Sequence, residues 1–78
     1  MVHRLKIQSN YLENLLNGRK RVEIRFNDRD YQTGDILQFC DEKGIYDFCI
    51  LHIHSGLGMA DGYVALSVMN TNNQNSKV

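Results

Sequence analysis

The feature that most constrains this chain is a change in the spacing of its apolar residues at Gly18. Four apolar residues before this glycine share one face of a helix: Tyr11, Leu12, Leu15 and Leu16. Three apolar residues after it alternate with charged ones, which is the period of a β-strand: Val22, Ile24 and Phe26. Gly18 can end the helix in the left-handed conformation, so the sequence predicts a helix followed directly by a strand.

The remainder of the chain reads mainly as strands and turns. We expect Ser9 to cap the helix, and we expect five strands: 5–7, 21–26, 36–40, 45–54 and 63–68. Gly34 suits a turn that needs a positive φ. Residues 45–54 carry apolar side chains at both odd and even positions, and therefore on both faces of a strand. Either both faces are covered, or a bulge near Leu51 shifts the register.

A chain of 78 residues can form one domain at most. One helix followed mostly by strands predicts an α+β fold, closed as a small β-barrel of about five strands with the helix plugging one end. We expect this domain to span 1–69 and the polar segment 70–78 to be a disordered tail.

Cysteine content and hydropathy bear on the compartment. Two cysteines are too few for a disulfide scaffold, so we expect Cys40 and Cys49 to be reduced thiols. A turn at Lys43-Gly44 would place residue 40 opposite 47 and diagonal to Cys49, which is a poor geometry for a disulfide. No apolar run is long enough to span a membrane, and no signal peptide is evident. These features predict a cytoplasmic protein without membrane contact.

The formal charge is zero overall but is divided along the chain. Residues 1–29 hold seven Lys and Arg against three Asp and Glu, which is 7 − 3 = +4. Residues 30–78 hold two against six, which is 2 − 6 = −4. If this division persists in the fold, one face attracts anions.

Within the cationic part, Lys20, Glu23 and Arg25 are the candidates for a site. Glu23 and Arg25 share one face of the strand 21–26 with Arg21. One interpretation is a polar cleft in which Lys20 and the arginines meet an anionic ligand, with Glu23 orienting them or accepting a hydrogen bond from a base or sugar. The other is a solvated charged face whose salt bridges contribute little.

Three further features of the sequence bear on binding. His52 and His54 alternate on one strand face, but two imidazoles without a third ligand do not make a metal site, and we expect none.

The glycine-rich segment 55–62 is expected to be a flexible loop that can form a lip over the cleft. For base stacking we expect Tyr31 and Tyr63 to be exposed beside the cations, and the phenylalanines to lie in the core.

The octet Gly18-Arg19-Lys20-Arg21-Val22-Glu23-Ile24-Arg25 reads G-x-K-x-x-E-x-R and resembles the signature of the ASCH domain in the PUA-like superfamily. With NDRD, GD and a late GYVAL, residues 3–69 resemble a small bacterial and phage ASCH-like group of uncharacterised function. The resemblance implies a PUA-like barrel that binds RNA or a nucleotide. It also implies a ligand-binding role for six residues: Lys20, Glu23, Arg25, Asn27, Arg29 and Tyr63.

Two alternatives to RNA or nucleotide binding remain open. One ASCH branch hydrolyses acetylated cytidine with a lysine and a threonine on this strand, but residues 21–25 contain no Ser or Thr, so we assign no catalytic residue. The other alternative is a regulator that binds a protein through its charged faces, without nucleic acid. The sequence indicates no cofactor.

Overall fold

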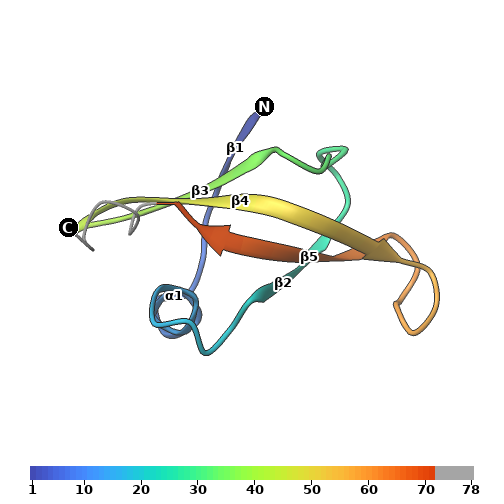
Figure 1. The fold of residues 1–78 in the computed structure, drawn as a ribbon, viewed down its shortest axis with the longest axis horizontal. Coiled ribbons are helices and arrows are strands. Elements are labelled where there is room, and N and C mark those ends of the chain that lie inside the picture. The colour runs from blue at the N-terminus through green and yellow to red at the C-terminus, as the bar shows by residue number, and fades with distance from the viewer. Residues whose placement is uncertain (72–78) are drawn as a thin grey trace.

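A computed structural model describes residues 1–71. Five strands form one mixed sheet in the order β1-β3-β4-β5-β2, and a single helix lies between β1 and β2 in the chain (Figure 1). The elements are β1 (Val2–Leu5), α1 (Ser9–Leu16), β2 (Val22–Phe26), β3 (Ile36–Asp41), β4 (Gly44–Ser55) and β5 (Tyr63–Asn70). This confirms the predicted α+β class with five strands and one helix.

The sheet is curled but does not close into a full barrel. β1 runs parallel to β3, and the other neighbours are antiparallel. β1 and β2 are the two edges of this sheet. The fold of the described residues is therefore a half-barrel with an open side between β1 and β2, and α1 lies at one end of that side (Figure 1).

The first strand and the helix start differ from the predictions. The strand predicted at 5–7 is wrong, because pairing with β3 begins at Val2 opposite Ile36 and ends at Leu5. The helix begins at Ser9, so Gln8 occupies the N-cap position and makes no side-chain capping bond. The prediction that Ser9 caps the helix is therefore wrong. Gly18 does take a positive φ of 83° after the helix.

The β3–β4 hairpin has its turn one residue earlier in the chain than predicted. Asp41 pairs with Gly44 and Cys40 with Ile45, so Glu42 and Lys43 form the turn. The predicted register, with residue 40 opposite 47, is wrong. Cys49 lies opposite Ile36, which places the two cysteines four residues apart along the hairpin. Both are free thiols.

The bulge near Leu51 is confirmed. The pairing of β4 with β5 shifts between Ile50 and His52, and Leu51 between them is 51% exposed whereas Ile50 is buried. β5 continues to Asn70, and Thr71 N–H donates to the carbonyl of Asp47. The predicted tail is therefore wrong for residues 70 and 71, and its remainder, 72–78, lies outside the described residues.

The core combines one helix face with the inner face of the sheet. Its largest fully buried side chains come from β3, β4 and β5: Leu37, Phe39, Phe48, Ile50 and Leu66. Leu12 and Leu15 of α1 pack against them. Among the phenylalanines, the core prediction is confirmed for Phe39 and Phe48 and is wrong for Phe26, which is 53% exposed.

Candidate functional site

The strand β2 presents its charged face inward and its apolar face outward. Glu23 is 6% exposed, whereas Ile24 is 57% exposed. A period of two shows which residues share a face but does not show which face is buried. The interpretation of a solvated charged face is therefore wrong for Glu23.

Glu23 is buried because two cations hold it. Arg25 Nε donates to Glu23 Oε2 at 2.8 Å, and Lys20 Nζ lies 3.4 Å from Oε1. Burial of a carboxylate is costly unless it is paired and hydrogen-bonded, and both of its oxygens are paired here. The structure thus brings together Lys20, Glu23 and Arg25, with Glu23 orienting the two cations.

Arg25 also crosses the open side of the half-barrel. Its Nη2 donates to the carbonyl of Lys6 at 2.8 Å, and its guanidinium lies 5.7 Å from the ring centroid of Phe39. Arg25 therefore joins β2 to the segment after β1. Since the described strands β1 and β2 are not paired with each other, this side chain is a direct tie between the two edges.

A cationic hollow of about 400 Å³ lies beside this tie. It is lined by residues of β1 and the segment after it, of β2, and of the turn that follows β2: Arg4, Leu5, Lys6, Arg25, Phe26, Asp28, Arg29 and Tyr31. Four cations and one carboxylate give it a formal charge of 4 − 1 = +3. Cations gathered in a concave surface attract anions.

A smaller hollow of about 290 Å³ adjoins it and shares Lys6, Arg25 and Phe26. Its other lining residues come from the start of the helical segment and from β2: Ile7, Gln8, Tyr11, Glu23 and Ile24. We call the two hollows together the β1–β2 groove. Tyr11 is 48% exposed in this groove, and Lys20 Nζ lies 5.6 Å from its ring centroid. The groove therefore offers an accessible aromatic ring close to cations.

The six predicted site residues do not all lie in the groove. Arg25, Arg29 and Glu23 line it. Lys20 lines a different hollow of about 500 Å³, between the end of α1 and β5, and contacts Glu23 and Tyr11 of the groove. Asn27 and Tyr63 instead line a separate hollow of about 200 Å³ with the loop 55–62.

Asn27 and Tyr63 each contact a residue that lines the larger hollow of the groove. Asn27 Oδ1 accepts a hydrogen bond from the N–H of Tyr31 at 3.2 Å, which holds the turn after β2. Tyr63 packs edge-on against Phe26 with ring centroids 5.4 Å apart. The loop 55–62 borders the separate hollow of about 200 Å³ and does not line the β1–β2 groove.

Tyr31 is not available for stacking, because it is only 4% exposed. Burial raises the pKa of its phenol. Its ring packs edge-on against His3, with centroids 4.8 Å apart. The predicted stacking role of Tyr31 is therefore wrong, and the exposed rings of the groove belong to Tyr11 and Phe26.

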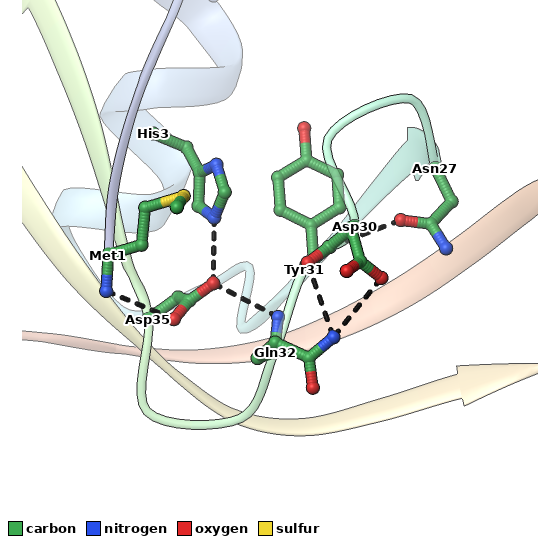
Figure 2. A network of polar contacts seen from close by, with 7 residues as sticks. All are labelled: Met1, His3, Asn27, Asp30, Tyr31, Gln32 and Asp35. Atoms are coloured by element: carbon green, nitrogen blue, oxygen red, sulfur yellow. Dashed lines mark hydrogen bonds and ion pairs between the residues drawn. The ribbon is translucent and has the colours of Figure 1, made fainter.

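His3 and Asp35 form a second buried polar network (Figure 2). His3 Nε2 lies 2.7 Å from Asp35 Oδ2, and the N–H of Gln32 donates to the same oxygen at 3.0 Å. The N-terminal ammonium of Met1 donates to Oδ1 at 3.2 Å. The hydrogen bond from His3 is the largest cause that lowers the pKa of Asp35 from 3.8 to about 2. This network ties β1 to the start of β3.

Sequence reasoning missed Arg4 and Lys6 as members of the site. They alternate with Leu5 and Ile7, and this alternation was the available signal. Only the parallel pairing of β1 with β3, a contact between distant segments, places them opposite β2.

The described residues 1–71 contain no group of three His, Cys, Asp or Glu side chains that could hold a metal ion. His54 Nε2 lies 2.8 Å from the carbonyl oxygen of Leu57, so this imidazole is engaged by its own loop. Within the same residues, no helix has the length and apolar content needed to cross a membrane.

The fold and the groove define a small α+β half-barrel protein with a cationic concave site. The family model "Domain of unknown function (DUF3850)" matches residues 2–68, so the chain belongs to the DUF3850 family. It is similar to an uncharacterised 12.9 kDa protein in the GpA 3′ region of Escherichia phage P2, with 42% identity over 36 residues. That match covers 46% of this chain but only 33% of the phage protein.

A solved structure supports the fold. The crystal structure of hypothetical protein PH0355 superposes with a TM-score of 0.68, covering 90% of this chain and 99% of that one. The two sequences are 19% identical, so this likeness concerns the fold alone.

Proposed function

We propose that this protein binds RNA or a nucleotide-like anion in the β1–β2 groove. The observation that carries the proposal is the convergence of Arg4, Lys6, Arg25 and Arg29 on one hollow whose lining includes a single carboxylate, Asp28. Three of these cations have no ion pair with a carboxylate among the interactions described, and the fourth, Arg25, is held by Glu23. A cation held in place by Glu23, together with three cations without a described ion pair, can bind the phosphates of a nucleic-acid chain.

The aromatic side chains of the groove favour nucleotides over simple anions. Tyr11 and Phe26 are both about half exposed and line the smaller hollow beside Arg25. Nucleic-acid bases stack on such rings whatever their sequence, and cations beside the rings bind the backbone. This agrees with the resemblance to the ASCH domain, which we retain as part of the proposal.

Recognition accounts for the site better than hydrolysis. Glu23 stands where the hydrolytic ASCH branch is expected to have a threonine, and both of its oxygens are already paired with cations. No hydroxyl side chain lies on β2 to act as a nucleophile. The proposal therefore assigns binding and no catalytic step.

The test is fluorescence anisotropy of a labelled single-stranded RNA hexamer with charge-reversed variants. Arg4→Glu and Arg29→Glu should each weaken binding and reduce its dependence on salt. Three phosphate contacts give a slope of log K against log salt of about −2.1 for a single strand. Lys43→Glu is the matched control, because it makes the same charge change in the turn between β3 and β4. Equal losses in all three variants would contradict binding at the groove.

A further inference from the structure

The polar side chain best placed to read a base is already occupied. Glu23 faces the smaller hollow, but its Oε1 and Oε2 are taken by Lys20 and Arg25. Arg25 in turn donates to Glu23 and to the carbonyl of Lys6. Donors and acceptors for a base in this hollow must therefore come largely from elsewhere.

The backbone of β2 supplies such groups on its free edge. The carbonyl of Arg21 accepts from Val68 N–H at 3.0 Å, and Asn27 N–H donates to the carbonyl of Gly62 at 2.7 Å. In an antiparallel pair, residues that bond the neighbouring strand alternate with residues whose N–H and C=O point away from it. The register with β5 thus directs the backbone groups of Val22, Ile24 and Phe26 away from β5.

These groups point to the edge of the sheet, because β2 is the last strand in the order. The carbonyl of Phe26 already accepts from Asp28 N–H at 2.8 Å. No backbone hydrogen bond described for residues 1–71 engages Val22 or Ile24 on this edge. Ile24 lines the smaller hollow, and the exposed ring of Tyr11 lines the same hollow.

We infer that the base of a bound nucleotide is recognised by the free main-chain N–H and C=O of Ile24 on the β2 edge, while it stacks on Tyr11. This inference rests on the proposed function and names how the same groove selects its ligand. Arg4, Lys6 and Arg29 then hold the phosphate in the adjoining larger hollow. The ligand class is an unpaired nucleotide of single-stranded nucleic acid.

The chemistry of bases fits this edge. Each of the four bases carries a donor beside an acceptor on its Watson–Crick edge, and a strand residue presents an N–H and a C=O on the same side. Such an edge accepts only a base that is not already paired, as in single-stranded recognition of RNA. A sugar phosphate that lacks a base gains nothing from Ile24 or Tyr11.

The experiment compares uridine, cytidine, adenosine and guanosine 5′-monophosphates with ribose 5-phosphate, by amide NMR titration. Ile24→Pro removes the free N–H and leaves the β5 ladder intact, because proline is tolerated where the N–H faces away from the sheet. Ile24→Val is the matched control, since it keeps the N–H and shortens the side chain. We expect the wild type to bind at least one monophosphate about tenfold more tightly than ribose 5-phosphate.

In Ile24→Pro this preference should fall clearly below the wild-type value but stay above unity, because stacking on Tyr11 remains. Ribose 5-phosphate should bind as before, and Ile24→Val should behave as the wild type. Wild-type affinity of Ile24→Pro for the monophosphates would overturn the inference. If Ile24→Pro does not fold, the amide NMR signal of Ile24 in the wild type provides the test. This signal should shift with the monophosphates and not with ribose 5-phosphate. Absence of that shift would overturn the inference. Failure of every probe, ribose 5-phosphate included, would instead count against the groove itself and the proposed function.

Discussion

Two carboxylates of this small fold are buried, and their surroundings differ. Asp35 is held by His3, the N-terminal ammonium and a backbone N–H, and it is not among the residues that line the β1–β2 groove. Glu23 is held by Lys20 and Arg25, and it lines the groove together with Arg25. A buried carboxylate alone therefore does not mark a site. The difference lies in whether a cation that holds the carboxylate also lines the groove, as Arg25 does for Glu23.

The largest expected effect is that of Arg25→Ala, which should affect both stability and binding. It leaves Glu23 with one partner and removes the tie to the Lys6 carbonyl. Loss of this partly buried hydrogen bond should cost about 1–3 kcal/mol of unfolding free energy, measured by urea denaturation. RNA affinity should fall in the same variant.

Arg29→Ala is the matched control for that comparison. It removes the same charge from the same hollow, but no hydrogen bond or ion pair of Arg29 is described in residues 1–71. It should therefore weaken RNA binding and leave the urea midpoint nearly unchanged. A loss of stability equal to that of Arg25→Ala would show that the Glu23 network has no special structural role.

The contribution of the Asp35 network to stability should depend on pH. The pKa of Asp35 lies near 2 in the folded chain against an ordinary value of 3.8, so its stabilising contribution is complete above the ordinary value. It should be lost as the pH falls from there through about 2. Asp35→Asn should lower the urea midpoint at neutral pH and flatten its decline in this acidic range.

RNA affinity at neutral pH separates the two carboxylates further. Asp35→Asn should leave it unchanged, because none of the groove cations is a partner of Asp35. A weakened RNA affinity in a folded Asp35→Asn protein would contradict the division between a structural and a site-forming carboxylate.

A smaller effect is expected at the rim of the groove, from Tyr11→Leu. Loss of one stacked base should weaken RNA binding by about 1–3 kcal/mol, measured by anisotropy. Stability should change little because the ring is half exposed. Tyr46→Leu is the control, since Tyr46 lies on β4 opposite Phe39 and is not among the groove residues. Equal binding losses in the two variants would remove Tyr11 from the site.

Most elements of the fold could be predicted from the sequence, because the spacing of apolar residues within a short segment indicates a helix or a strand. The helix, the strand after Gly18, the β3–β4 hairpin and the bulge near Leu51 each follow from residues close together in the chain. The orientation of β2 could not be predicted in this way. Alternation defines its two faces, but the burial of Glu23 depends on Lys20 and Arg25 neutralising it in three dimensions.

Only part of the candidate site could be predicted, because some of its residues meet through contacts between distant segments. Lys20, Glu23 and Arg25 lie close together in the chain, and the charge pattern made them candidates. Arg29 was added only by the resemblance to the ASCH-like group. Arg4 and Lys6 join them through long-range pairing of β1 with β3. The burial of Tyr31 and the exposure of Phe26 likewise depend on which side of the half-barrel each residue occupies.

The central claim is that the β1–β2 groove binds single-stranded nucleic acid, and amide NMR mapping of a short single-stranded RNA tests it most directly. Titrations at about 50 and 200 mM salt should show shifts confined to residues 4–11 and 22–29 that weaken as salt rises. Shifts at the loop 55–62 alone, or no shifts with any RNA, would contradict the claim.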